Sequence, residues 1–296
     1  MVLVTQYLKL IRIHHWVKNL FFFLPIFFSG KFLAFDLYYK IVPGFLLFCF
    51  TSSFIYVLND IRDFELDQLH PEKKFRPLAS GKITTSKAYL LLAMLLGLAI
   101  LSAFFVNTAC IAFVASYFIL NILYSFGLKN IAIIDVAIIA LGFVFRVMCG
   151  GVLTDIEVSK WLMLMTFLLA LFLALAKRRD DVLIFNERGE KMRKSISGYN
   201  LQFLDTSLAM LCAIIIVCYI SYTNSPEVVA HFGTDKIYLT TFFVIIGLLR
   251  YLQISLVEKK SSSPTKILLK DLFLQVVVVS WFITFVLLLY FKQTAS

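Results

Sequence analysis

Three aspartates at the end of an apolar run are the residues best suited to chemistry. Asp60, Asp63 and Asp67 follow an i, i+3, i+7 spacing, which puts three carboxylates on one face of a helix. The run before them, Ile41 to Leu58, is long and apolar enough to span a membrane. Like charges at a bilayer boundary repel one another unless a cation balances them. Oxygen ligands at this density predict Mg²⁺ bridging to a substrate diphosphate. The alternative is a solvated acidic helix end.

The elements that position these carboxylates are apolar segments. The chain has 296 residues, of which 60% are hydrophobic and 16% charged, and so few charges cannot coat a soluble surface of this size. The pattern predicts an all-α integral membrane protein. Pro25 and Gly30 interrupt the first of its spans. No Pro/Gly/Ser-rich linker separates two bodies, so we expect one membrane domain over 1–296. The nine predicted spans are 19–38, 41–58, 88–106, 108–126, 131–152, 160–177, 201–222, 236–254 and 269–291.

The basic residues are distributed unevenly between the two sides of these spans. Most of the 28 Lys and Arg lie before the first span and in segments 59–87, 127–130, 177–200 and 250–270. The positive-inside rule therefore predicts a cytoplasmic N-terminus, cytoplasmic long loops and an external C-terminus. The net charge of +10, in a chain embedded in the lipid bilayer, favours lipid headgroups or phosphorylated substrates over nucleic acid as partners. The alternate segments hold Lys31, Lys40, Lys160, Lys236 and Lys292.

Two basic side chains near or within the spans are further candidates. Arg146 lies in the middle of a predicted span, where a charge costs about 2.5–3.5 kcal/mol on insertion scales. A functional role is therefore expected, or an ion pair with Asp135, which lies eleven residues earlier in the sequence. Lys18 either extends from the first span to the interface or binds a phosphate group.

Several short stretches, taken in order, resemble one known superfamily. They are His15-Trp16-Val17-Lys18-Asn19, Asn59-Asp60-x-Arg62-Asp63-x-Glu65-x-Asp67, Phe75-Arg76-Pro77, Tyr124-x-x-Gly127-Leu128-Lys129, Arg146-x-x-x-Gly150-Gly151, Lys177-Arg178 and Arg193-Lys194-Ser195. The chain resembles the UbiA-type intramembrane prenyltransferase superfamily, and within it the decaprenyl-phosphate phosphoribosyltransferase branch. Ile13 and His15 depart from that branch, where proline and glutamine are expected.

The resemblance implies a nine-transmembrane-helix bundle whose central cavity is open to the cytoplasmic side, with active-site loops at about 59–87 and 177–200. Prenyltransferases of the superfamily carry a second DxxxD motif. Here Lys177 stands at its leading position, and only Asp181 remains. Replacing a carboxylate by lysine beside Arg178 changes a metal-ligand position into an anion-binding one.

The resemblance also implies roles for individual residues. Asp60, Asp63 and Asp67 are expected to hold Mg²⁺ and to be catalytic. The expected partners are phosphoribosyl diphosphate and polyprenyl phosphate in a bacterial inner membrane, and the sequence leaves a homo-oligomer open. The product would be a lipid-linked phosphoribose for cell-envelope polysaccharides. The expected substrate-binding residues are Lys18, Asn59, Arg76, Tyr124, Lys129, Arg146, Lys177, Arg178, Asp181, Arg193 and Lys194.

Two other functions remain alternatives at this stage. An ordinary prenyltransferase would attach an isoprenoid to an aromatic acceptor, but Lys177 removes a carboxylate from its second motif. A non-catalytic lipid transporter or scaffold would explain the spans equally well. It would give no reason for an acidic and a basic segment on the same predicted side.

Overall fold

The computed structural model describes residues 2–69, 73–188, 194–258, 267–268 and 270–293. All the regular secondary structure in this part of the chain is helical. The helices pack into two compact units, each described here by itself. Unit 1 comprises Met1–Gly127 and Gly142–Val158, and unit 2 comprises Leu128–Leu141 and Ser159–Ser296.

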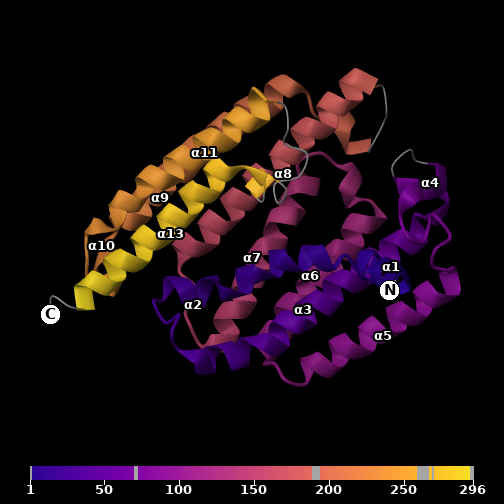
Figure 1. Ribbon diagram of the computed structural model, residues 1–296, viewed down its shortest axis with the longest axis horizontal. Helices are drawn as coiled ribbons and strands as arrows, with labels where there is room; N and C mark the ends of the chain where they lie inside the picture. Colours follow the sequence, from indigo (N-terminus) through magenta and orange to yellow (C-terminus); the bar gives the residue numbers. More distant parts are fainter. Residues whose placement is uncertain (1, 70–72, 189–193, 259–266, 269, 294–296) are drawn as a thin grey trace. The chain divides into compact units, whose positions relative to one another are not determined.

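Unit 1 contains the acidic segment. Its helices are α1 (Val2–Leu10), η1 (Ile13–Phe23), α2 (Leu24–Phe28), α3 (Phe35–Arg62), α4 (Phe64–Leu69), η2 (Lys73–Phe75), α5 (Thr85–Ala103), α6 (Thr108–Phe126) and the second part of α7 (Ile134–Thr154). Helix α3 packs against α5 and α6 (Figure 1). Phe22, Ile41 and Phe48 are fully buried in its core. The carboxylates at the end of α3 therefore follow a helix anchored by apolar packing.

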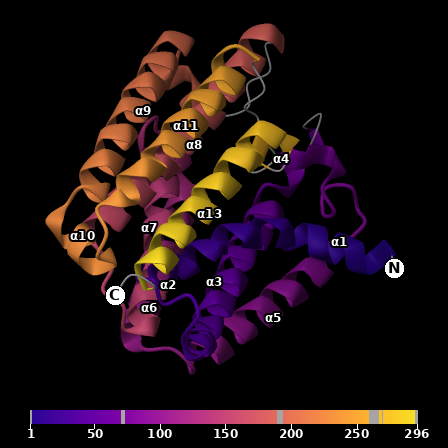
Figure 2. The same ribbon diagram turned by 60° about the vertical axis from the view of Figure 1, so that its left-hand side comes forward.

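Unit 2 contains the basic segment. Its helices are the first part of α7, η3 (Leu128–Asn130), α8 (Lys160–Arg188), η4 (Lys194–Gly198), α9 (Leu201–Thr223), α10 (Pro226–Phe232), η5 (Lys236–Thr240), α11 (Thr241–Leu256) and α13 (Leu272–Gln293). Helix α8 lies beside α9, and α11 lies beside α9 and α13 (Figure 2). The side chain of Asn200 accepts a hydrogen bond from the Phe203 N–H and so begins α9.

Eight helical segments in the described residues are long and apolar enough to span a membrane, and they correspond to eight of the nine predicted spans. The predicted first span, 19–38, is not a continuous helix. Segment η1 ends at Phe23, and the short α2 carries Pro25 in its first turn. Gly30 then has a φ of 71°, which is a left-handed conformation that ends helices. The count of nine spans is therefore not confirmed.

The predicted loop at 177–200 also differs from the structure. Helix α8 continues past Lys177 as far as Arg188, so the basic residues at 177–179 lie on a helix. The sequence predicted a loop here because the charged residues from Lys177 onward end the apolar pattern. They do not end the helix. The other predicted loop, 59–87, begins with the last turn of α3 and includes α4 and η2.

Gly150 permits a close approach of α7 to the η1 backbone. A Cβ at Gly150 would overlap the backbone carbonyl group of Phe22. We expect Gly150→Ala to destabilise the protein by about 1–3 kcal/mol, because backbone atoms have to shift. Thermal unfolding in detergent measures the effect. Gly97→Ala is the matched control, since nothing lies within 4 Å of its added Cβ. Equal melting temperatures for the two variants would contradict the prediction.

Candidate active site

Asp60, Asp63 and Asp67 lie where α3 passes into α4. Helix α3 ends at Arg62, and Asp63 is its C-cap. The backbone keeps a helical register through this break, because the Asp63 N–H donates to Asn59 O and the Asp67 N–H donates to Asp63 O. Asp60 and Asp67 are buried, at 3% and 2% exposure, and Asp63 is half-buried. The single helix predicted for these three aspartates is thus two helices, α3 and α4, that meet at Asp63.

Two arginines bind the two buried carboxylates. Arg76 Nη1 lies 3.1 Å from Asp60 Oδ1 and 2.6 Å from Asp67 Oδ2. Arg12 Nη2 lies 2.6 Å from the same Asp60 Oδ1. Lys73 Nζ lies 4.0 Å from Asp67 Oδ1. Asp60 and Asp67 therefore point at one positive group, although seven residues separate them in the sequence.

This convergence tests whether the segment suits a divalent cation. Two buried carboxylates that share one guanidinium nitrogen have the charge and orientation to share a metal ion. Among the described residues, however, no group of three or more His, Cys, Asp and Glu side chains is placed to hold a metal. Asp60 and Asp67 fit as the core of the predicted Mg²⁺ site, and the three-aspartate site stays a prediction.

Arg146 is enclosed by neutral groups of unit 1. Its Nε donates to Asn19 Oδ1 at 2.7 Å, its Nη1 to Gly142 O at 2.5 Å and its Nη2 to Tyr117 OH at 3.4 Å. The rings of Phe48, Tyr117 and Phe143 surround the guanidinium at 4.5–5.4 Å. The predicted alternative of an ion pair with Asp135 is wrong, because Asp135 pairs with Arg178. Arg146 thus positions Asn19.

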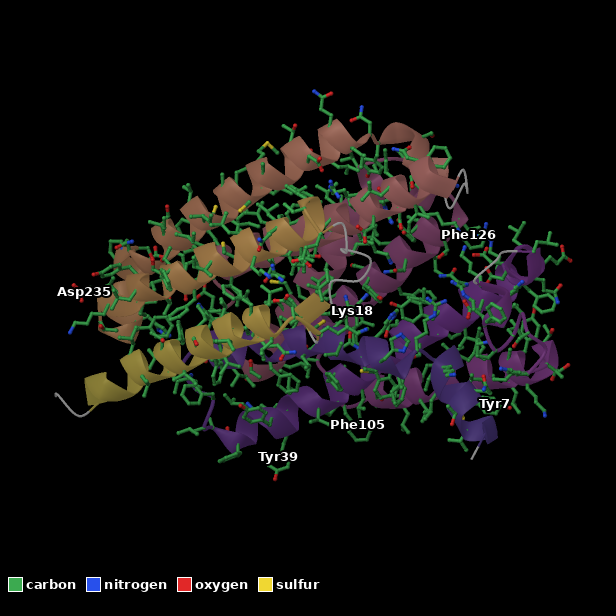
Figure 3. All side chains as sticks on the ribbon, turned by 45° about the horizontal axis from the view of Figure 1, so that its top comes forward. Tyr7, Lys18, Tyr39, Phe105, Phe126 and Asp235 are labelled. Atoms are coloured by element: carbon green, nitrogen blue, oxygen red, sulfur yellow. The ribbon has the colours of Figure 1, made fainter. Side chains whose placement is uncertain are left out.

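Lys18 precedes Asn19 in η1 and is half-buried; Figure 3 labels it on the segment that follows α1. Burial lowers the pKa of the Lys18 ammonium to about 8, and the positive charges of Arg146 and Arg12 contribute to this lowering. A cation in such surroundings gains more from a bound anion than one in water does.

The remaining candidates of unit 1 lie near the ends of α3 and α6. Asn59 and Tyr124 are half-buried. Arg62, which the sequence places inside the acidic motif, turns away from the carboxylates. It donates to Ser125 O at 2.5 Å and stacks on the ring of Phe126 (labelled in Figure 3) at 4.3 Å.

The basic segment of unit 2 is organised around a buried carboxylate. Asp135 is 0% exposed. Its Oδ2 accepts from Arg178 Nε at 2.7 Å and from Ser195 Oγ at 3.3 Å, and its Oδ1 accepts from Tyr199 OH at 2.6 Å. Arg178, 1% exposed, also donates to Asp181 Oδ2 at 2.7 Å. Arg178 is therefore held between two carboxylates.

Tyr199 fastens the segment after η4 to the start of α7. Its hydroxyl accepts from the Ile133 N–H at 2.6 Å while donating to Asp135. Ile133 has a φ of 69°, which is a strained conformation for a β-branched residue. Burial, and then the hydrogen bond to Asp135, raises the pKa of the Tyr199 hydroxyl, so it stays a donor at neutral pH.

The other predicted residues of unit 2 are more accessible or less completely described. Lys177 is exposed, and Lys129 in η3 is half-buried. Arg193 lies outside the described residues, and Lys194 begins η4 without a described side chain. Of the five basic residues of unit 2 expected to bind substrate, Lys177 is thus the one that the described residues show to be exposed.

Comparison with known proteins places the chain in a family. The sequence model of the UbiA prenyltransferase family matches residues 19–277. The chain belongs to this family. It is 30% identical to a decaprenyl-phosphate phosphoribosyltransferase of Mycolicibacterium smegmatis, over 98% of the chain and 94% of that protein. It is 31% identical to the enzyme of that name from Corynebacterium glutamicum, over 96% of the chain and 86% of that protein.

The fold of this UbiA-family protein agrees with solved structures. A UbiA homolog from Archaeoglobus fulgidus bound to DMAPP and Mg²⁺ superposes with a TM-score of 0.67 at 20% identity, covering 96% of this chain and 98% of that one. The family membership and the eight apolar helices together make the chain an integral membrane protein.

Sequence reasoning did not include two residues of this UbiA-family chain, Arg12 and Asp135, among the candidate site residues. Arg12 pairs with a carboxylate 48 residues away, and Asp135 receives bonds from residues 43 to 64 positions away. No local spacing links such partners. The sequence could have indicated only that Arg12 and Asp135 are charged residues beside apolar runs, and that such residues are expected to form ion pairs.

Proposed function

We propose that this protein transfers 5-phosphoribose from phosphoribosyl diphosphate to a polyprenyl phosphate, with Mg²⁺ as cofactor. The observation that carries the proposal is the near-full-length similarity to proteins named decaprenyl-phosphate phosphoribosyltransferase. The finer family expectations belong to the proposal: nine membrane-spanning segments, a central cavity open to the cytoplasmic side, a cytoplasmic N-terminus, an external C-terminus and a bacterial inner membrane. A role in cell-envelope polysaccharide synthesis belongs to it too.

The reaction exchanges one bond at the ribose. An anionic oxygen of the polyprenyl phosphate attacks C1, a new C1–O bond forms, and the C1–O bond to diphosphate breaks. The acceptor is already anionic at neutral pH, so it requires positioning and charge balance more than deprotonation. A bound Mg²⁺ ion would neutralise the departing diphosphate. Asp60, Asp63 and Asp67 are proposed to hold the ion, with Asn59 orienting a metal-bound water or a ribose hydroxyl.

The cationic residues are proposed to bind the phosphate groups. In unit 1, Arg76 steadies the carboxylates, and Lys18 binds an anionic phosphate next to Asn19. In unit 2, Lys177 is the accessible cation, and Lys129, Arg193 and Lys194 are proposed to assist it. Arg178 is the exception. Because Asp135 and Asp181 neutralise it, we propose that it orients Asp181 toward a ribose hydroxyl.

Label transfer in a reconstituted system tests this function. Purified protein in lipid nanodiscs receives labelled phosphoribosyl diphosphate, polyprenyl phosphate and Mg²⁺. We expect label to move into the organic phase, and none to move without the acceptor. A parallel reaction contains a prenyl diphosphate and an aromatic acceptor. Prenyl transfer there, without phosphoribosyl transfer, would overturn the proposal in favour of an ordinary prenyltransferase.

The pH dependence of substrate affinity tests the role of Lys18. Its ammonium has a pKa of about 8, so its positive charge is present below pH 8 and is lost as the pH rises through that value. We expect KM for the phosphate substrate that it binds to increase between about pH 7 and pH 9. Lys18→Arg keeps its charge over this range and is expected to flatten the increase. The same increase in both proteins would show that Lys18 does not bind the anion.

A further inference from the structure

Arg12 has an unusual backbone conformation. Its φ of 53° and ψ of 49° are left-handed, which costs a residue other than glycine about 1–2 kcal/mol. The strained residue lies between α1 and η1, where its N–H donates to Lys9 O and its carbonyl accepts from the His15 N–H. Such a conformation persists only where the surroundings compensate for it.

The side chain of Arg12 supplies that compensation through a short ion pair. Its Nη2 lies 2.6 Å from Asp60 Oδ1, and its guanidinium stacks over the ring of Tyr56 at 4.7 Å. Asp60 is 3% exposed, whereas the side chain of Arg12 is 22% exposed. The pair therefore joins a buried carboxylate to a cation at the edge of the water-accessible surface.

Arg12 and Arg76 share this carboxylate but differ in what else they hold. Arg76 Nη1 also binds Asp67, at 2.6 Å. Within the described part of the chain, Asp60 is the one carboxylate that Arg12 reaches. A divalent cation bound through Asp60 Oδ1 and one oxygen of Asp67 would leave Arg76 the other oxygen of Asp67. It would take from Arg12 the one carboxylate that this side chain reaches in the described residues.

We propose that Arg12 competes with a divalent cation for Asp60 and, once displaced, binds an anionic phosphate group of a substrate. This rests on the proposed function for the metal and the substrate. A partly buried guanidinium without an anion is unfavourable, and its planar fork of donors suits phosphate oxygens. Lys18, a second cation within electrostatic reach, adds to the preference for an anion. Arg12 thus couples metal binding to substrate binding.

The coupling predicts effects of opposite sign on two affinities. Arg12→Gln removes the competing cation, so Mn²⁺ alone should bind about tenfold tighter, on the scale of one charged hydrogen bond. The same variant should raise the KM of one phosphate substrate about tenfold. An increase for phosphoribosyl diphosphate assigns Arg12 to the donor, and one for polyprenyl phosphate assigns it to the acceptor. A purely structural role would weaken both affinities or neither.

Mn²⁺ binding to full-length protein in nanodiscs, followed by electron paramagnetic resonance without substrates, is the deciding measurement. Arg62→Gln is the matched control. It removes an arginine that lies between Asp60 and Asp63 in the sequence but contacts Ser125 O and the ring of Phe126, not a carboxylate. We expect its Mn²⁺ affinity to be unchanged. Arg12→Lys keeps the charge and should lie between wild type and Arg12→Gln.

The outcomes separate this inference from the proposed function. Tighter Mn²⁺ binding in Arg12→Gln with no phosphoribosyl transfer in wild type leaves the competition standing and rejects the reaction. Unchanged or weaker Mn²⁺ binding in Arg12→Gln overturns the competition, as does wild-type protein that binds no Mn²⁺. Unchanged KM values for both substrates overturn the phosphate-binding step. If Arg12→Gln elutes as aggregate, Arg12→Lys decides by the same criteria.

Discussion

Asp67→Asn is expected to lower turnover by about 10²–10³-fold or more while leaving the protein folded in the membrane. Asparagine keeps the size of the side chain but removes the negative charge that balances a cation, and loss of one preorganised electrostatic group has an effect of this order. Asp67 is 2% exposed and shares Arg76 with Asp60, so water cannot easily replace it. Initial rates of label transfer measure the effect.

Glu65→Gln is the control for this variant. It makes the same chemical change two residues away, but Glu65 is exposed and is expected to be dispensable. EDTA should reproduce the Asp67→Asn defect in wild type, and added Mg²⁺ should reverse it. Wild-type turnover in Asp67→Asn would remove the argument for a metal at this segment.

The order of the spans was readable from sequence because it depends on local composition. Membrane helices need a run of apolar residues, and eight such runs became eight long helices. The first run does not form one continuous helix, because Pro25 and Gly30, which the sequence already shows inside it, change the backbone conformation there. Helix α8 extends beyond its apolar run as far as Arg188, because the Lys, Arg and Asp residues that follow the run are compatible with a helix.

The candidate site was readable only in part, for a related reason. The spacing of Asp60 and Asp67 predicted a shared face, and both carboxylates do contact Arg76. Asp135 shows the limit of such reasoning. The sequence suggested Arg146, on the same helix, as its partner, whereas the structure pairs it with Arg178 on α8. Which of two arginines reaches a carboxylate depends on helix packing, and spacing along one helix carries no information about that.

Asp135→Asn is expected to be the most destabilising of these substitutions, by about 3–5 kcal/mol, because it removes one partner of a buried ion pair. Arg178 is 1% exposed, so water cannot replace the lost carboxylate as a partner of its guanidinium. Asp135 also accepts from Tyr199 OH, a hydrogen bond that the amide would accept less strongly. Thermal unfolding in detergent, followed by size-exclusion chromatography, measures the loss.

Asp205→Asn is the matched comparison, since Asp205 pairs with Arg179, the next residue of α8. Asp205 is 39% exposed, while Arg179 is 5% exposed and also donates to Ser255 O. Because one partner lies in solvent and Arg179 keeps a second acceptor, we expect this loss to be smaller, about 1 kcal/mol. The double variant Asp135→Asn/Arg178→Gln should be less destabilised than the sum of the single variants, because the buried guanidinium that Asp135→Asn deprives of a partner is then absent. Equal losses of stability for Asp135→Asn and Asp205→Asn would mean that burial of the Asp135–Arg178 pair does not determine how much it stabilises the protein.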